Sequence, residues 1–254
     1  MTLLFDTQSL FQRALTKVIR NPTLLFVNLF TPLLFLLLFS QLLEKLTSLP
    51  GLSGSYLEYL TPGILVLNCV TGAFQSGMSI VNDINSGFLQ KMLLTPASRT
   101  AILLGRLMTD LFVLIIQSAI IIGVAMLMGL TIATGFPGLL LIFVTLAFFD
   151  LAWAGILLAL GIKTKKAETV SAIGQLMAFP LLFVSSALFP IAIMPQWAQT
   201  VSDYNPISYA SDVTRDLIQG GLTWNTFASA YAVIGVIAIL AFVATLYQFR
   251  KLVS

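Results

Sequence analysis

The sequence predicts an all-α membrane protein with six transmembrane helices, because of its long apolar runs and the placement of its basic residues. Charged residues make up 9% of the chain and hydrophobic residues 58%, whereas about 25% of the residues in an average soluble domain are charged. A helix needs about 20 apolar residues to cross a bilayer. The expected spans lie near residues 22–43, 59–81, 102–129, 138–162, 168–189 and 229–249.

Uncharged stretches support each span in turn. Residues 21–43 and 59–82 carry no charge. The uncharged stretch 111–149 is long enough for parts of two helices, and it contains four residues typical of turns: Gly129, Gly135, Pro137 and Gly138. Because Gly and Pro interrupt helices, this stretch predicts two spans joined by a tight turn. The uncharged stretches 169–202 and 217–249 each supply one further span.

The basic residues predict the orientation. Of the 13 Lys and Arg residues, eleven fall at the two ends of the chain and in or beside the second and fourth gaps between spans. Only Lys45 and Arg215 lie on the opposite side. The positive-inside rule then places both termini in the cytoplasm, in a multi-pass protein of the cytoplasmic (inner) membrane. The net charge of +3 follows from this bias and requires no nucleic-acid partner.

Several chemistries are excluded by residue type. The chain has no His, and its single cysteine, Cys69, lies inside the second span, so neither a metal site nor an internal disulfide is expected. The phosphate-binding pattern G-x-x-x-x-G-K-[ST] is absent, so the chain lacks the usual means of binding ATP. The first apolar run is too long for a cleavable signal peptide and lacks a small-residue cleavage site. We expect a single membrane domain over residues 1–254, not an enzyme, energised by a partner or an ion gradient.

Residues 8–20 predict an amphipathic helix in the membrane interface. One face carries Leu10, Phe11, Ala14, Leu15, Val18 and Ile19, and the other carries Gln12, Arg13, Thr16, Lys17 and Arg20. This division fits a helical period of 3.6 residues. The helix is either a simple anchor or a part with a mechanical role.

A second amphipathic segment lies between the second and third spans. Phe88, Leu89, Met92 and Leu93 cluster on one side of a short predicted helix, which Pro96 ends. An apolar face of this kind lies on lipid headgroups or fills a groove on a partner protein.

Four segments of the chain carry a family resemblance. They are Tyr59-Leu-Thr-Pro-Gly63; Gly87-Phe88 through Leu94-Thr-Pro96, with Arg99; Leu188-Phe-Pro190 followed by Met194-Pro-Gln-Trp197; and Asn205-Pro-Ile-Ser-Tyr-Ala210 with Asp212 and Arg215. In this order between six spans, the chain resembles the membrane subunit of ABC exporters of the ABC-2 type, in the branch of daunorubicin-type permeases. One departure concerns the segment between spans 2 and 3, which is commonly acidic in the family. Here Asp83 is followed by Asn85, Ser86, Gln90 and Lys91, so the charge pattern offered to a partner is altered.

The resemblance implies an assembly. Two permeases would pair as a homodimer, and two separate ATPase subunits would bind ATP and Mg and dock beneath them. Residues 85–97 would form a coupling helix that contacts the ATPase through Gly87, Phe88, Leu89, Met92, Leu93 and Pro96. The 8–20 helix, with Phe11, Arg13 and Lys17, would pass ATPase motion to span 1. Residues 190–220 would form re-entrant helices in the outer leaflet; the alternative is an ordinary loop with Trp197 and Trp224 in the interface.

Three charged residues fall in the interior of predicted spans. Arg106 and Asp110 are one helical turn apart, and we expect them to form an i,i+4 pair near the cytoplasmic side. Asp150 lies near the middle of the fourth span without a partner at helical spacing. A charge at the bilayer centre costs about 2.5–3.5 kcal/mol or more, so Asp150 is a candidate functional residue that faces another helix or the dimer seam.

The sequence thus predicts the membrane subunit of an ATP-driven exporter for an amphipathic drug, lipid or lipid-linked glycan. Two alternatives from other classes stay open. One is a proton-coupled secondary transporter that uses Asp150, although no inverted repeat of interrupted helices is evident. The other is a non-transporting membrane scaffold, in which the amphipathic segments serve only as anchors.

Overall fold

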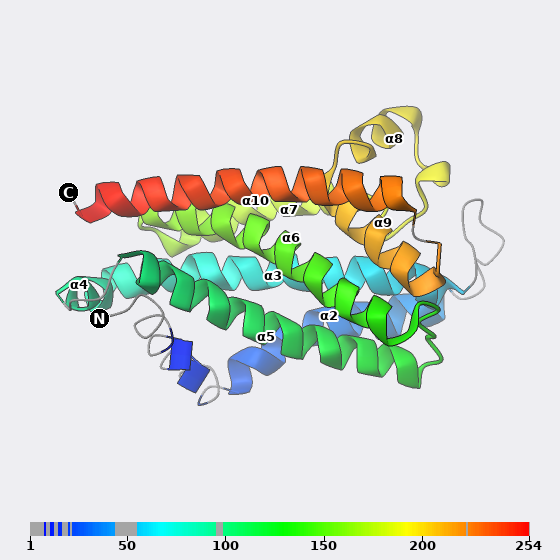
Figure 1. Cartoon of the computed structure of the whole chain (residues 1–254), viewed down its shortest axis with the longest axis horizontal. Coiled ribbons are helices and arrows are strands. Elements are labelled where there is room, and N and C mark those ends of the chain that lie inside the picture. The colour runs from blue at the N-terminus through cyan, green and yellow to red at the C-terminus, as the bar shows by residue number, and fades with distance from the viewer. Residues whose placement is uncertain are drawn as a thin grey trace.

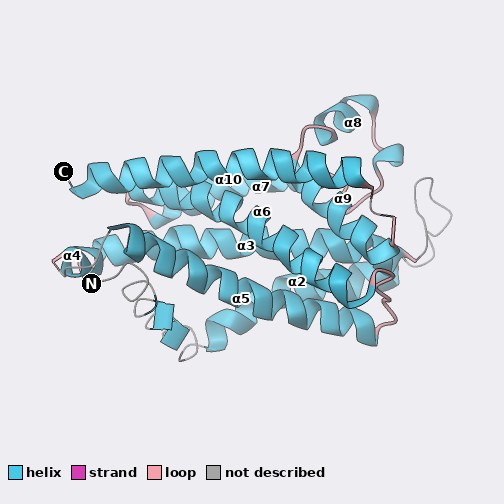
Figure 2. Cartoon of the chain, in the orientation of Figure 1, coloured by secondary structure: helices cyan, strands magenta, loops and turns pink. Residues whose placement is uncertain are grey.

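Helices form every regular element in the part of the chain that the structure, a computed structural model, describes. That part comprises residues 8, 11–12, 15–16, 20, 22–43, 55–94, 99–221 and 223–253. The long helices run roughly side by side along one axis (Figure 1). Loops and turns lie mainly at the two ends of the bundle (Figure 2). The predicted all-α class is confirmed over these residues.

Four of the described helices are long and apolar enough to cross a membrane. They are α3 (Tyr56–Asn85), α5 (Arg99–Leu127), α6 (Gly135–Thr164) and α10 (Trp224–Val253). Two shorter apolar helices, α2 (Pro22–Leu42) and α7 (Ala167–Phe183), lie at the positions of the first and fifth predicted spans.

The fifth predicted span was too long. We expected a helix over 168–189, but α7 ends at Phe183. The apolar composition continues beyond this point, yet the Ser185 hydroxyl donates to the Leu182 carbonyl at 2.6 Å and the backbone turns away. Residues 185–188 instead make backbone contacts with α3, which are described below.

α3 is the central helix of the bundle. It packs against α2, α5, α6, α7 and α9 (Pro206–Gln219), and 67% of its most apolar window is buried, against 17% for α10. Its first turn is fixed by a capping box, in which the Ser55 hydroxyl accepts from the Glu58 amide and the Glu58 carboxylate accepts from the Ser55 amide. The position of α3 therefore determines where the surrounding helices meet.

α6 and α10 pack closely against each other. The hydroxyl groups of Thr145 and Tyr231 lie 2.7 Å apart, and the Thr245 hydroxyl donates to the Gly155 carbonyl at 2.8 Å. Side-chain hydrogen bonds of this kind hold helices together where apolar lipid gives little driving force for association. The outer face of α10 carries exposed apolar side chains, which are Val236, Ile239, Leu240 and Val243.

Different elements mark the two ends of the bundle (Figure 1). One end carries the short helix α4 (Phe88–Leu93), the α6–α7 turn and the end of α10. The other end carries η2 (Ile191–Ile193), α8 (Gln196–Ser202) and α9, together with the α5–α6 turn. The first end matches the predicted cytoplasmic side, and the second matches the predicted outer side.

Candidate functional site

The predicted coupling segment forms the helix α4 at one end of the bundle. Gly87 precedes it with a φ of +70°, a left-handed conformation that glycine adopts at little cost. Phe88 and Met92 are half-buried, and Met92 packs against the core. Leu93 belongs to α4, whereas Pro96 lies outside the described residues.

We had expected Leu89 to lie on a free apolar face, but it does not. It is 1% exposed and belongs to the hydrophobic core of the chain itself. The six-residue helix turns back after Gly87, and this places Leu89 on the inner side of α4. The exposed apolar residue of the segment is Leu94, which is 88% exposed. The surface available to a partner is therefore displaced toward the end of α4.

Exposed lysines surround this end of the bundle. Lys91 lies on α4, and Lys163, Lys165 and Lys166 lie at the α6–α7 turn. The Asn85 amide donates to the Lys165 carbonyl at 3.4 Å, which connects that turn to the end of α3. This end of the bundle therefore carries four exposed lysines, one on α4 and three at the α6–α7 turn.

Only part of the predicted interface helix can be described. Residues 11–12 and 15–16 are helical, and the Phe11 ring makes an edge contact with Phe112 on α5, with centroids 5.9 Å apart. Arg13 and Lys17 lie outside the described residues.

Arg106 and Asp110 do not form the expected i,i+4 pair. Arg106 reaches across to α3, where its Nη1 lies 2.7 Å from Asp83 Oδ2 and its Nη2 donates to the Ser76 carbonyl at 3.1 Å. Asp110 accepts a hydrogen bond from the Ser76 hydroxyl at 2.5 Å. The helical spacing was correct, but α3 offers both charged groups better-oriented partners.

Asp150 faces the interior of the bundle, as predicted. It is 3% exposed on α6 and is covered by the chain's own helices. On α3, the Cys69 thiol points to the Leu146 carbonyl, one turn before Asp150, with the sulfur 3.8 Å from the oxygen. The side chains of Phe149 and Trp153 stack beside it on α6. Asp150 is therefore a core residue of the single chain.

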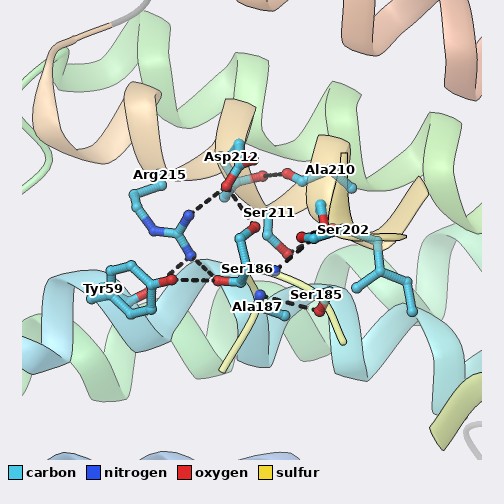
Figure 3. A network of polar contacts seen from close by, with 12 residues as sticks. Tyr59, Ser185, Ser186, Ala187, Ser202, Ala210, Ser211, Asp212 and Arg215 are labelled. Carbon is cyan, nitrogen blue, oxygen red and sulfur yellow. Dashed lines mark hydrogen bonds and ion pairs between the residues drawn. The ribbon is translucent and has the colours of Figure 1, made fainter. Parts of the chain in front are cut away.

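The outer end holds a polar network that sequence reasoning missed (Figure 3). We call residues 185–220, which contain η2, α8 and α9, the outer cap. At its centre Arg215 is only 8% exposed. Its Nη1 lies 2.6 Å from Asp212 Oδ1, its Nη2 donates to the Ser186 carbonyl at 2.6 Å, and its guanidinium carbon lies 3.9 Å from the centroid of the Tyr59 ring.

Further hydrogen bonds fasten the outer cap to the head of α3. The Tyr59 hydroxyl donates to the Ser186 carbonyl at 2.8 Å, and the Tyr56 hydroxyl donates to the Leu188 carbonyl at 3.0 Å. The Ser186 hydroxyl donates to Asp212 at 2.6 Å. Asp212 therefore balances Arg215 and orients the chain after α7 at the same time.

The α9 helix carries one more carboxyl near this network. Burial raises the pKa of the Asp216 carboxyl above its usual value, and the neighbouring Asp212 carboxylate adds to the rise, while Arg215 acts in the opposite direction. Beyond it, the end of α9 is fixed to the α5–α6 turn, where the Ala133 amide donates to the Ile218 carbonyl at 2.8 Å.

The network joins three of the four segments that carry the family resemblance. Tyr59 and Gly63 come from the head of α3, Leu188 from the segment after α7, and Arg215 from α9. A sequence signal existed, because these segments are among those that carry the family resemblance, but their contact in space could not be deduced from spacing.

Comparison with known proteins decides the family. A family model described as ABC-2 type transporter matches residues 6–218. The chain belongs to the ABC-2 type transporter family. It is 29% identical over 208 residues to the daunorubicin resistance ABC transporter permease protein DrrB1 of Streptomyces coeruleorubidus, with 82% of this chain and 73% of the relative covered. It is 31% identical over 230 residues to the transport permease ycf38 of Pyropia yezoensis, with 88% and 77% covered.

Membership fixes the broad role. The chain is an ABC-2 permease of the daunorubicin-resistance-like branch, the membrane subunit of an ABC transporter that works with a separate ATPase. A further relative is the probable doxorubicin resistance ABC transporter permease protein DrrC of Mycobacterium tuberculosis, 24% identical over 221 residues with 86% and 79% covered. In the described part of the chain, no group of three or more His, Cys, Asp or Glu is placed to hold a metal ion.

Proposed function

We propose that two copies of this permease form the transmembrane pathway of an ATP-driven exporter in the cytoplasmic membrane, which moves an amphipathic molecule outward. The observation that carries the proposal is the exposed side chain of Leu94, which projects at the end of α4, in the segment that the family resemblance predicts as the contact with the ATPase. ATP and Mg would bind to the partner ATPase.

The drug-resistance relatives support an amphipathic cargo, since they are named for daunorubicin and doxorubicin resistance. The decisive experiment is co-purification of the chain with an ATPase, followed by measurement of ATP turnover with and without daunorubicin as a probe cargo. A raised turnover supports the exporter. A chain that never associates with an ATPase would favour the scaffold or the proton-coupled alternative.

Six crossings are consistent with the lengths of the helices. At 1.5 Å per residue, the 21 residues of α2 span about 31 Å and the 17 residues of α7 about 25 Å, against a hydrocarbon core of about 30 Å. The shorter α7 reaches the outer side because the outer cap continues from its end. Three exposed aromatic residues near this side, Trp197, Tyr204 and Trp224, fit a re-entrant or interfacial position in the outer leaflet.

The proposed topology predicts which positions are labelled from outside the cell. On a Cys69→Ser background, single cysteines at Ser55, Gln90 and Ser254 would be exposed to a membrane-impermeant maleimide. We expect labelling of intact cells only at position 55, because positions 90 and 254 lie on the cytoplasmic side. Permeabilised cells should be labelled at all three positions. Labelling of position 90 or 254 in intact cells would reject the orientation.

The proposed ATPase contact predicts a specific uncoupling variant. Leu94→Asp should reduce co-purification with the ATPase about tenfold, because the apolar side chain that would enter a groove of the partner is replaced by a charge. Insertion in the membrane should be unchanged, because Leu94 is exposed. Gln90→Asp is the matched control, since it adds the same charge at an exposed polar position of α4.

The burial of Leu89 explains why Leu94, and not Leu89, is the position chosen for this test. Leu89→Asp would place a charge in the core, so it would damage the fold and could not report on docking. Equal loss of co-purified ATPase in Leu94→Asp and Gln90→Asp would show that the added charge, and not the loss of the leucine, weakens the association. Normal association in both variants would contradict the proposed contact.

A further inference from the structure

A polar cluster joins α3 and α5 near α4, and the function of the family does not by itself account for it. It consists of Ser76 and Asp83 on α3 and Arg106 and Asp110 on α5. Arg106 makes two contacts with α3, one to the Asp83 carboxylate and one to the Ser76 carbonyl. Asp110 makes a third contact, to the Ser76 hydroxyl. We call these four residues the α3–α5 clamp.

The burial of the α3–α5 clamp indicates that it fixes the arrangement of the two helices rather than adding to the stability of the fold. The side chains of Arg106 and Asp83 are 16% and 14% exposed. Removing two charges from water costs about as much as their attraction returns, so a pair of this kind adds little net stability over apolar side chains of the same volume. A guanidinium that holds a carboxylate and a carbonyl at once does, however, fix the direction and register of the two helices.

The clamp also lies next to the segment proposed to meet the ATPase. Asp83 is two residues before the end of α3, and Arg106 follows the start of α5 by about two helical turns. Between them the chain passes through Gly87, α4 and residues 95–98. The buried side chain of Leu89 fixes α4 to the core of the chain. The segment between α3 and α5 is therefore held by the clamp on its two flanks and by Leu89 within it.

We propose that the α3–α5 clamp makes α3, α4 and the cytoplasmic half of α5 move as one unit, so that displacement of α4 by the ATPase is passed to α5. Arg106 is the positioning residue of this unit. The inference rests on the proposed function for the source of the displacement, but the coupling of α4 to α5 is a property of this chain.

Distance measurements test the mechanical part without any cargo. Spin labels at Gln90 on α4 and Met108 in the first half of α5, both exposed, report the distribution of distances between the two helices in the purified permease. We expect a narrow distribution in the parent protein and a clearly broader one in Arg106→Met. Arg106→Lys should give an intermediate width, because an ammonium keeps the charge but not the two-pronged contact. Lys163→Met, which removes an exposed charge at the same end, should leave the distribution unchanged.

A second variant and a second readout complete the test. Asp83→Asn keeps the shape of the side chain and removes its charge, so it should broaden the distribution even if Arg106→Met does not fold. In complexes with the ATPase, both variants should keep basal ATP turnover and lose about tenfold in its stimulation by daunorubicin. Unchanged distance distributions in Arg106→Met and Asp83→Asn would overturn the inference. Failure of the unmodified permease to bind an ATPase would instead count against the proposed function, because the distance measurement needs no partner.

Discussion

Replacement of Gly63 by alanine is expected to prevent the outer cap from seating on α3 and so to abolish the accumulation of folded protein. A Cβ at this position would lie far inside van der Waals contact with the Ala187 carbonyl oxygen and 2.9 Å from the Ala187 Cα. The obstacle is backbone, which cannot rotate away as a flexible side chain can. Overpacking of a core usually costs about 1–3 kcal/mol, and we expect this substitution to reach or exceed that range.

The backbone at Ala187 cannot shift without breaking the polar network. The carbonyl of the preceding residue, Ser186, accepts from both Tyr59 and Arg215, and the carbonyl of the following residue, Leu188, accepts from Tyr56. Movement of this segment would remove the Ser186 carbonyl from the buried Arg215 guanidinium and take from the two tyrosine hydroxyls the carbonyls to which they donate. Each unsatisfied group of this kind costs about 1–3 kcal/mol, and more where it is charged.

Gly72→Ala provides a matched control on the same helix. No atom lies within 4 Å of a Cβ built at Gly72, and alanine is favoured over glycine in a helix by about 1 kcal/mol. Yield after detergent extraction and the midpoint of thermal unfolding should therefore fall sharply for Gly63→Ala and stay level or rise for Gly72→Ala. Normal yield and unfolding temperature for Gly63→Ala would show that the cap does not pack on α3 as described.

The helical class and the positions of the long helices could be predicted because a bilayer imposes simple rules. Uncharged runs of about 20 residues and the turn residues between Gly129 and Gly138 were enough to place α5 and α6. The end of α7 was harder to predict. Residues 184–189 are uncharged, with four apolar residues and two serines, and composition alone does not end the helix there. The segment instead makes contacts with residues more than a hundred positions earlier, Tyr56 and Tyr59.

The candidate sites were predicted less well, for the same reason. Helical spacing suggested that Arg106 would pair with Asp110, but the geometry of a neighbouring helix gave Arg106 a closer partner in Asp83. Spacing likewise placed Leu89 on an apolar face without revealing that the chain itself covers that face. Arg215 was predicted only as part of a family segment and as a charge on the outer side, because sequence alone cannot show that it is buried against Tyr59. The burial of Asp150 inside the single chain agrees with one of its two predicted positions, against another helix rather than at the dimer seam, and its functional role stays a prediction.

Asp150 gives the prediction that separates an ATP-driven exporter from a proton-coupled carrier. In the exporter, Asp150 is a core group at a helix-packing position, 3% exposed and beside the α3 residue Cys69. Asp150→Asn should then retain most of the transport activity, because the amide keeps the shape of the side chain and its hydrogen-bonding capacity. Asp150→Leu should lose assembly or activity by tenfold or more, because a buried carboxyl needs a hydrogen-bond partner and leucine would leave that partner unpaired.

A carrier that uses Asp150 to bind the transported proton would behave differently, because an amide cannot exchange a proton at that site. Asp150→Asn would then abolish transport, and an imposed proton gradient would drive the parent protein without ATP. Vesicles that contain the permease and its ATPase, with daunorubicin as the probe, distinguish the two cases when they are energised with ATP alone or with a proton gradient alone. Phe148→Leu serves as the control, since this neighbour on α6 is uncharged and 43% exposed, with its ring against Tyr231 of α10. We expect the parent, Asp150→Asn and Phe148→Leu proteins all to transport daunorubicin with ATP alone. Gradient-driven transport that is present in the parent and lost in Asp150→Asn would overturn the assignment of ATP as the energy source.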